Sequence, residues 1–423
     1  MVAYSDQTVL EIARVDFANV VRTLAMNPDA VMVGRLVKRF VHDTFRLSVG
    51  GMTRTVKVPL GIERPLNANW IVAVGGSDDT PYRSEKELRE IFLPLPGQSW
   101  VVLSFGFGNR RGQWRAWLFH GTDVSPIGTL KIAGGPYLLL RNSPINDPQT
   151  PSKIPARWSR LTNMLGSKFV ESLRDMHVMV IGASRNGSVA ARQLATLGIG
   201  KLTLVDPDVL EIHNFDAMLG GDLGDIGNKK VSALANEITR YCDDIAVTGI
   251  PSTATDLRVA ERAQNADVLV TCVDHGTPVL LAAQLANCWN KIHLDIGTSV
   301  QRTESGELTM SGDVRLFLPR QGCAACVGGI ADREDAELEL RLPPGVRPIR
   351  PSIDFRQQRA GSLVTLNAIT VSIGIQHLID TLTGRSTTSR WSRVDWRPDG
   401  LLVADRAVSG LPECKWCGIN SSP

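Results

Sequence analysis

The chain has 423 residues, of which 43% are hydrophobic and 21% charged, and its formal net charge is +3. This length and hydrophobic content allow two or three domains with substantial cores. The 46 basic and 43 acidic residues are mixed along the chain, so the charge does not indicate a nucleic-acid partner. The first residues lack the basic and apolar regions of a signal peptide, and no apolar run long enough to cross a membrane follows. We therefore expect a cytoplasmic protein with no membrane partner.

A turn-rich stretch divides the chain. Residues 142–155 contain four prolines among Asn, Asp, Ser and Thr, a composition typical of a linker. We predict an N-terminal domain over residues 1–145, a linker over 146–156 and a C-terminal domain over 157–423.

The N-terminal domain is expected to be a small α+β domain. Residues 1–40 look helical, and the apolar runs Trp100–Phe105 and Trp114–Phe119 indicate paired strands. Its only histidines are His42 and His120, and it has no cysteine. The region therefore indicates no catalytic metal site, and its role stays open.

The C-terminal domain alternates apolar strands with helices. Strands are expected at residues 177–181, 202–206, 267–273 and 292–296, and helices from the following turn to 197, at 230–240 and at 278–289. This order begins with a βαβ unit and predicts a doubly wound, mostly parallel α/β sheet of the Rossmann-like kind.

A glycine-containing loop follows the first of these strands and opens a helix. It reads Gly182-Ala-Ser-Arg185-Asn-Gly187-Ser, with two of the three glycines of a dinucleotide fingerprint. Backbone N–H groups at such a helix start can hold phosphate. Asp206 ends the second strand, where a carboxylate can bind the ribose hydroxyls of a nucleotide. Taken alone, the loop is equally compatible with a structural turn.

Four of the seven cysteines form two Cys-x-x-Cys pairs far apart in the chain. Each pair can turn two thiolates toward one metal ion, so the pairs predict a single tetrahedral Zn²⁺ site. Four thiolates leave no open coordination position, which makes the site structural. The alternatives are a chance repetition and a redox motif. The predicted ligands are Cys323, Cys326, Cys414 and Cys417.

Further motifs follow one another along the C-terminal domain. They are Arg157-Trp158-Ser159-Arg160, Ile226-Gly-Asn-Lys-Lys230 and Cys272-Val273-Asp274. Together with the cysteine pairs, they resemble the ThiF/MoeB/HesA family, the adenylating domain of ubiquitin-activating (E1-like) enzymes. The resemblance extends over residues 154–418. The glycine loop is similar to that of a bacterial branch with an extra N-terminal domain, so residues 1–145 are compatible with a degenerate JAB-like domain.

The resemblance implies ATP- and Mg²⁺-dependent adenylation of a ubiquitin-like or sulfur-carrier protein that ends in glycine. It implies that Asp206 binds ribose, Asn214 lies on the phosphate side, Lys230 contacts the triphosphate and Asp274 ligates Mg²⁺. Arg160 is implied to reach the ATP of a second copy, which makes the protein a homodimer. The structural alternatives are a solvated helix residue for Lys230 and helix caps for Asn214 and Asp274.

The sequence departs from the family pattern at several positions. Ala217 stands where the family has a phosphate-contacting arginine, and Arg185 in the glycine loop is a candidate replacement. Gln357 aligns with the cysteine that forms a thioester or persulfide in other members. The reaction is therefore expected to stop at the acyl-adenylate or to pass to a hydroxyl such as Ser352 or Ser362. A downstream conjugating or deconjugating protein is a further expected partner.

Three cysteines lie outside the zinc motif. Cys242, Cys272 and Cys288 lie in or beside predicted core elements, which predicts that they are buried packing residues. None of them is an evident acceptor of an activated carboxylate.

Two other functions are compatible with parts of the pattern. A nicotinamide-dependent oxidoreductase would use the same βαβ unit and Asp206. A scaffold that binds a ubiquitin-like protein without turnover would explain Ala217 and the missing cysteine. Lys230, Asp274 and the doubled Cys-x-x-Cys favour the adenylating enzyme over the oxidoreductase.

Overall fold

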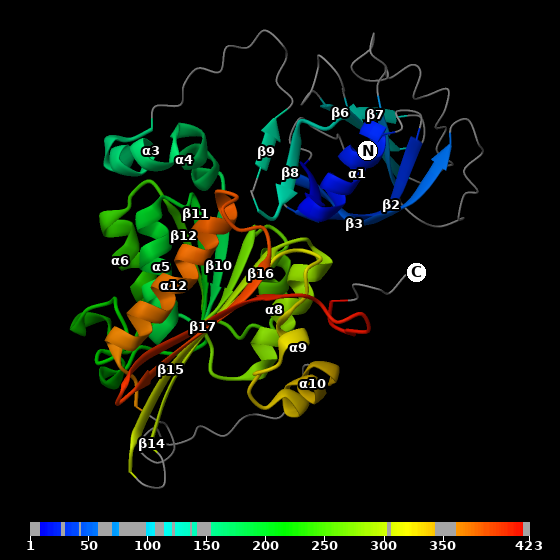
Figure 1. Ribbon diagram of the computed structural model, residues 1–423. Coiled ribbons are helices and arrows are strands. Elements are labelled where there is room, and N and C mark those ends of the chain that lie inside the picture. Colours follow the sequence, from blue (N-terminus) through cyan, green and yellow to red (C-terminus); the bar gives the residue numbers. More distant parts are fainter. Residues whose placement is uncertain are drawn as a thin grey trace. The chain divides into compact units, whose positions relative to one another are not determined.

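The computed structural model describes residues 9–26, 30–41, 44–57, 70–75, 99–105, 114–120, 123–135, 138–141, 154–302, 306–342 and 361–417. The chain divides into two compact units, Met1–Pro151 and Ser152–Pro423 (Figure 1). Within the described ranges, no helix is both long and apolar enough to cross a lipid bilayer.

The N-terminal unit is built on one nine-stranded sheet in the order β7-β6-β5-β4-β2-β3-β1-β8-β9. Helix α1 (Arg14–Met26) packs the buried Val20 and Leu24 into the core of this unit. The strands are β1 (Val9–Ala13), β2 (Ala30–Val41), β3 (Thr44–Lys57), β4 (Trp70–Gly75), β5 (Ser99–Phe105), β6 (Trp114–His120), β7 (Asp123–Pro126), β8 (Thr129–Ala133) and β9 (Leu138–Arg141).

Part of the secondary structure predicted for this unit is wrong. Strands β5 and β6 form the expected antiparallel pair. Residues 1–40, however, are not a helical region, because the described part of that range contains helix only at 14–26 and strand at 9–13 and from 30 onward. The segment β2 contains four valines, whose branched side chains favour extended backbone over helix.

The C-terminal unit contains an eight-stranded sheet in the order β12-β11-β10-β13-β14-β15-β16-β17. The five neighbours β12, β11, β10, β13 and β14 pair in parallel, and β14, β15, β16 and β17 pair antiparallel. The strands are β10 (His177–Ile181), β11 (Lys201–Val205), β12 (Ala246–Ile250), β13 (Val268–Thr271), β14 (Ile292–Arg302), β15 (Leu308–Phe317), β16 (Ser389–Arg397) and β17 (Gly400–Val408).

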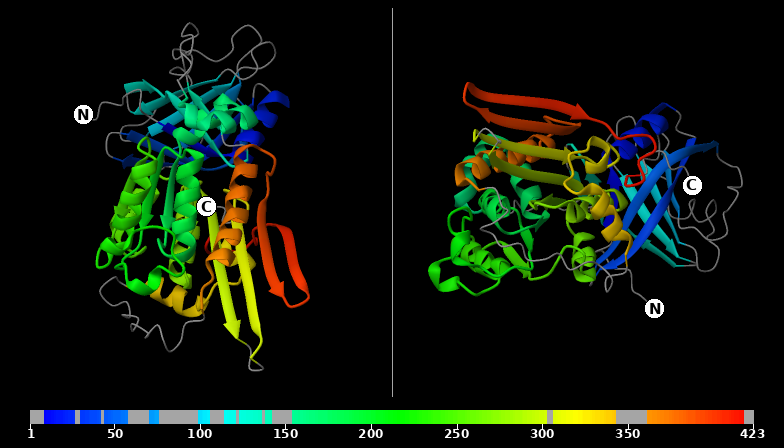
Figure 2. Two further views of the ribbon diagram at one scale, coloured as in Figure 1. Left: turned by 90° about the vertical axis from the view of Figure 1, so that its left-hand side faces the viewer. Right: turned by 90° about the horizontal axis from the view of Figure 1, so that it is seen from below.

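Helices cover the two faces of this sheet (Figure 2). On one face, Gly374 of α12 lies so close to β14 that an added Cβ would come within 2.9 Å of Ile296. On the other, Val259 of α7 and Ala282 of α8 pack with Met179 of β10. The helices are α3 (Ser159–Leu165), α4 (Ser167–Arg174), α5 (Arg185–Leu197), α6 (Lys230–Tyr241), α7 (Leu257–Ala263), α8 (Gly276–Cys288), α9 (Ala324–Val327), α10 (Arg333–Arg341) and α12 (Val364–Leu382), with short 3₁₀ turns η2 (Ala156–Trp158), η3 (Ile212–Asn214) and η4 (Leu223–Asp225).

The α/β class and the largely parallel sheet are thus confirmed. Fully buried apolar strands such as β10 are typical of parallel sheets covered on both faces, which is why the sequence predicted them. The antiparallel extension β15 to β17 was not predicted. All residues of β17 from Gly400 to Ala407 are exposed although Leu401, Leu402 and Val403 are apolar, so composition alone does not reveal this strand at the edge of the sheet.

Candidate functional site

Three loops that the sequence singled out meet at one edge of the C-terminal sheet. Strand β10 lies between β11 and β13, and all three run in parallel. The loop beginning at Gly182 follows β10, Asp206 follows β11, and Asp274 lies just beyond β13. In doubly wound sheets, ligands bind at this carboxyl edge, where the strand order reverses.

The glycine loop is closely packed against the neighbouring strand. Gly182 has a φ of +90°, and a Cβ there would lie 2.4 Å from the carbonyl oxygen of Cys272. A Cβ on Gly187 would lie 1.7 Å from the carbonyl oxygen of Gly182. Both glycines are therefore required for the loop to close over the start of α5.

Replacing Gly187 with alanine is expected to destabilise the C-terminal unit by about 1–3 kcal/mol or more, because the methyl group cannot fit beside Gly182. Thermal or urea unfolding measures the change. Gly297→Ala is the matched control, since a Cβ at Gly297 has no neighbour within 4 Å. Equal stability of the two variants would contradict the packing argument.

Asp206 joins the glycine loop to the segment that follows β11. Its Oδ2 accepts a hydrogen bond from the N–H of Ala183 at 2.8 Å, and its Oδ1 accepts one from the N–H of Asp208 at 2.9 Å. Burial raises the pKa of the Asp206 carboxyl, and the nearby positive charge of Lys230 opposes that rise. The carboxylate therefore shapes the loop directly, in addition to any contact with ribose.

Lys230 is buried and paired with a second aspartate. Its side chain is 7% exposed, and its Nζ lies 2.8 Å from Oδ2 of Asp208, whose side chain is 62% exposed. A solvated helix residue would not be buried in this way. The sequence interpretation did not identify Asp208 as a site residue, although its spacing of two from Asp206 was the available signal.

Arg185 and Asp274 are also brought together. Nη2 of Arg185 lies 3.7 Å from Oδ2 of Asp274, and the two side chains are 31% and 47% exposed. Asp274 does not cap α8, because the helix begins at Gly276 after the N-cap residue His275. An exposed carboxylate at the end of β13 is thus placed beside the cation of the glycine loop.

The other two residues implied by the resemblance, Asn214 and Arg160, take no part in these ion pairs within the described residues. Oδ1 of Asn214 accepts a hydrogen bond from the N–H of Glu211 at 2.9 Å and caps the turn η3. This oxygen therefore stabilises the local backbone. Arg160 is exposed on α3 and forms no ion pair with any residue in the described ranges. Trp158 anchors this motif, since its Nε1 donates to the carbonyl of Thr196 at 3.3 Å.

A buried polar network connects the glycine loop to α12. Nδ2 of Asn186 donates to Oγ1 of Thr298 at 3.2 Å, and that hydroxyl donates to Oδ1 of Asn367 at 2.9 Å. Nδ2 of Asn367 in turn donates to Oγ of Ser362 at 3.0 Å. The sequence interpretation missed Asn186, Thr298 and Asn367, because nothing in their local pattern marks them as neighbours.

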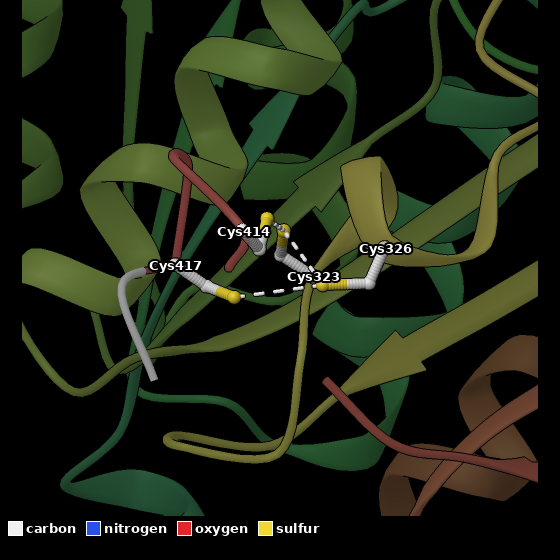
Figure 3. Close-up of side chains that lie close together, drawn as sticks. All are labelled: Cys323, Cys326, Cys414 and Cys417. Atoms are coloured by element: carbon white, nitrogen blue, oxygen red, sulfur yellow. Dashed lines mark hydrogen bonds between the residues drawn. The ribbon is translucent and has the colours of Figure 1, made fainter. Parts of the chain in front are cut away.

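The four cysteines of the two pairs converge (Figure 3). All four sulfur atoms lie within 4.8 Å of one another. Sγ of Cys323 lies 3.8 Å from that of Cys326 and 3.7 Å from that of Cys414, and Cys326 and Cys417 are 3.5 Å apart. Zinc–sulfur bonds of about 2.3 Å place tetrahedral sulfurs roughly 3.8 Å apart. The donor set and its spacing therefore fit a closed Zn²⁺ site.

Helix α10 holds both cysteine pairs. Nη1 of Arg333 donates to the carbonyl of Ala325, inside the first pair, at 3.1 Å. Glu337 forms an ion pair with Lys415 and accepts a hydrogen bond from Nε1 of Trp416, both inside the second pair. These contacts orient the two pairs toward each other, as the surroundings of metal ligands commonly do.

The remaining cysteines do not all behave as expected. Cys242 is buried, Cys272 is half-buried and Cys288 is exposed, so the prediction of burial was wrong for Cys288. The reason is that Cys288 lies on the outer face of α8, whereas its neighbours Ala286 and Trp289 pack into the core. Burial raises the pKa of the Cys272 thiol, which makes it a poor nucleophile. Gln357 and Ser352 lie outside the described residues.

The chain is similar in sequence to several known adenylyltransferases and activating enzymes. The molybdopterin-synthase adenylyltransferase of Escherichia coli (strain K12) is 27% identical over 177 residues, covering 40% of this chain and 67% of that protein. The sulfur carrier protein ThiS adenylyltransferase of the same organism is 25% identical over 255 residues, covering 60% and 90%. The ubiquitin-like modifier-activating enzyme 5 of Oryza sativa subsp. japonica is 25% identical over 169 residues, covering 37% and 38%.

A model of the ThiF family matches residues 158–396, which include the glycine loop, Asp206, Lys230 and Asp274. The match spans more than half of the chain. The chain therefore belongs to the ThiF family.

Proposed function

We propose that this E1-like adenylyltransferase activates the C-terminal carboxylate of a ubiquitin-like or sulfur-carrier protein that ends in glycine. The observation that carries the proposal is the set of charged groups at the carboxyl edge of β10, β11 and β13. There, the buried Lys230 with its exposed partner Asp208, and the partly exposed pair Arg185–Asp274, adjoin the loop that Asp206 holds in place. The adenylyltransferase names of two relatives support the reaction.

ATP would lie across this edge. The N–H groups of the glycine loop and the start of α5 would hold phosphate oxygens, and Asp206 would bind the ribose. Lys230 and Arg185 would face the negative charge of the triphosphate, with Asn214 on the same side. Asp274 would hold Mg²⁺, which would offset charge on the phosphate oxygens.

In the proposed reaction, the carrier carboxylate attacks the α-phosphorus of ATP. The bond from this phosphorus to the bridging oxygen of the β-phosphate breaks, and pyrophosphate leaves. The product is a mixed anhydride between the carrier and AMP. Since a free carboxylate is a poor acylating agent, this step prepares the carrier for a later nucleophile. Cationic side chains aimed at the departing pyrophosphate stabilise the transition state.

A second copy of the chain would complete the site. Arg160 is exposed and unpaired within the described residues, so it is available to contact ATP bound by a partner subunit. An arginine supplied in this way stabilises charge that develops on transferred phosphate. We therefore include a homodimer in the proposal, with Zn²⁺ at Cys323, Cys326, Cys414 and Cys417 as a structural ion.

The proposed reaction ends at the acyl-adenylate. No cysteine occurs between Cys326 and Cys414. Ser362 is in contact with the amide of Asn367, which cannot serve as a base. A downstream conjugating or deconjugating protein would then receive the activated carrier. In this proposal the N-terminal unit is a degenerate JAB-like domain that serves the same step.

The test is exchange of labelled pyrophosphate into ATP. The full chain is assayed with Mg²⁺, ATP and small glycine-ending carrier proteins, and with carriers whose terminal glycine is deleted. Exchange that depends on the terminal glycine is the expected result. Absence of exchange with every carrier, together with intact ATP binding, would instead identify a scaffold without turnover.

Arg185→Ala is expected to raise the KM for ATP by about tenfold or more, because a charged hydrogen bond to phosphate is lost where the family's own arginine is replaced by Ala217. Steady-state pyrophosphate exchange measures the change. Arg258→Ala, at a side chain that is 71% exposed on α7, is the control. An unchanged KM would remove Arg185 from the phosphate site.

A further inference from the structure

Three polar residues form a row across neighbouring strands on the α8 side of the sheet. Thr271 of β13 is the register partner of Asp295 of β14, and Asp295 is the register partner of Arg315 of β15. Their exposed fractions are 0%, 3% and 7%. Thr271 is the last residue of β13, three residues before Asp274. The row therefore lies directly beneath the loop that carries the proposed Mg²⁺ ligand.

Hydrogen bonds join the row into one unit. Oγ1 of Thr271 donates to Oδ1 of Asp295 at 2.6 Å. Nε and Nη2 of Arg315 lie 2.9 and 2.6 Å from Oδ2 of Asp295. The third guanidinium nitrogen, Nη1, donates to the carbonyl of Gly328 at 2.6 Å. One buried side chain thus bonds a strand carboxylate and a loop carbonyl at the same time.

Gly328 begins the segment that leaves the first cysteine pair, and this segment crosses the start of α8. A Cβ on Gly276 would lie 2.4 Å from the carbonyl oxygen of Ala331 and 2.6 Å from the side chain of Ile330. The next residue of α8, Thr277, donates its hydroxyl to Oε2 of Glu339 on α10 at 2.6 Å. The segment Gly328–Ala331 therefore packs two residues away from Asp274.

We propose that Arg315 is a positioning residue for the adenylation site, which fixes the segment Gly328–Ala331 against the start of α8 and thereby holds the Asp274 loop in place. The inference rests on the proposed function, because it assigns Asp274 to the reaction. A buried ion pair is weak evidence for stability alone, since well-packed apolar residues often replace such pairs without loss. The planar fork of arginine can bond two acceptors at fixed angles, whereas the single ammonium of lysine cannot reproduce that geometry.

The test compares Arg315→Lys with the parent chain. Lysine retains the charge beside Asp295 but loses the bond to Gly328. The amide of Gly328 donates to the carbonyl of Ala324 at 3.2 Å. Hydrogen–deuterium exchange in peptides covering residues 328–332 is expected to become about tenfold faster at this amide, because the segment is no longer fixed by the charge-assisted bond to its carbonyl. The KM for Mg²⁺-ATP is expected to rise by a similar factor, with a smaller change in kcat and unchanged content of bound zinc.

Arg393→Lys is the matched control. Arg393 also pairs across strands, with Asp313 at 3.4 Å, but its side chain is 47% exposed and its other ion pair is with Asp395 on its own strand. A double variant, Asp295→Asn with Arg315→Met, removes both buried charges and guards against misfolding caused by one unpaired charge. It is expected to show the same faster exchange at residues 328–332.

The outcomes distinguish failure of the positioning role of Arg315 from failure of the proposed adenylation. Hydrogen exchange at residues 328–332 that matches the Arg393→Lys control in both Arg315 variants would overturn the positioning role, whatever the activity. Faster exchange with an unchanged KM would also overturn it, because the segment would then not act on the site. If the parent chain forms no adenylate with any carrier, the proposed function fails, and Mg²⁺-ATP binding by calorimetry replaces KM in deciding the role of Arg315.

Discussion

Asp274→Asn is expected to reduce the rate of pyrophosphate exchange by about 10²- to 10³-fold, the usual effect of removing one group that stabilises transition-state charge. Asparagine keeps the size of the side chain but loses the negative charge needed to hold Mg²⁺. The fold should be unaffected, because the Asp274 side chain is 47% exposed and its ion pair with Arg185 spans 3.7 Å. Pyrophosphate exchange kinetics measure the expected loss of rate, and thermal melting of the same preparation checks that the stability of the fold is unchanged.

Asp399→Asn is the control for this experiment, since Asp399 is exposed in the turn between β16 and β17, remote in the chain from the glycine loop. It should exchange pyrophosphate at the parental rate. An Asp274→Asn enzyme with more than about a third of the parental rate would remove this residue from the mechanism. A large loss of melting temperature would instead show that Asp274 supports the fold.

Removal of the metal from the cysteine cluster is expected to lower the melting temperature of the C-terminal unit sharply. Binding of structural zinc contributes on the order of 10 kcal/mol of folding free energy in small zinc domains. Here the cluster joins α9 to the segment after β17, and Cys323 and Cys417 pack with Val279 and Leu280 of α8. Without the metal, the antiparallel extension loses this attachment to the core. Melting curves with and without a chelator measure the effect.

Cys323→Ser should reproduce the effect of the chelator, and Cys288→Ser should not, because Cys288 is exposed and lies outside the cluster. Contact with the Cys417 thiol lowers the pKa of Cys323 to about 6, which favours the thiolate form that binds zinc. Elemental analysis should find about one zinc per chain. Purified protein without bound metal, or a melting temperature that the chelator leaves unchanged, would refute the zinc assignment.

Local patterns accounted for much of the C-terminal unit. Strand β10 and helix α5 appear where a fully apolar run is followed by a glycine turn and an amphipathic helix. The loop glycines were identified by spacing alone, and the structure adds that Gly182 and Gly187 touch one another. The cysteine pairs were also recognisable from spacing, because a metal demands several thiolates in a small space.

Contacts between distant segments were not predictable in the same way. Asp208 lies 22 residues before Lys230, and no local pattern pairs the two, whereas the structure brings its carboxylate 2.8 Å from the lysine. Arg315 was one of many arginines, and only the register of β14 against β15 shows that it faces Asp295. In the N-terminal unit the prediction of helix was wrong for β2, which is extended and pairs with β3 and β4.

By itself, the sequence determined the alternating strands and helices of the parallel sheet, the glycine loop, the two cysteine pairs and the family, because each depends on residues close together in the chain or on motifs with a fixed spacing. Only the tertiary structure decided which charges pair, that β15 to β17 extend the sheet and that Arg315 joins Asp295 to Gly328. The physical reason is that these contacts depend on strand register and on the packing of segments far apart in the chain, and no local periodicity encodes either of them.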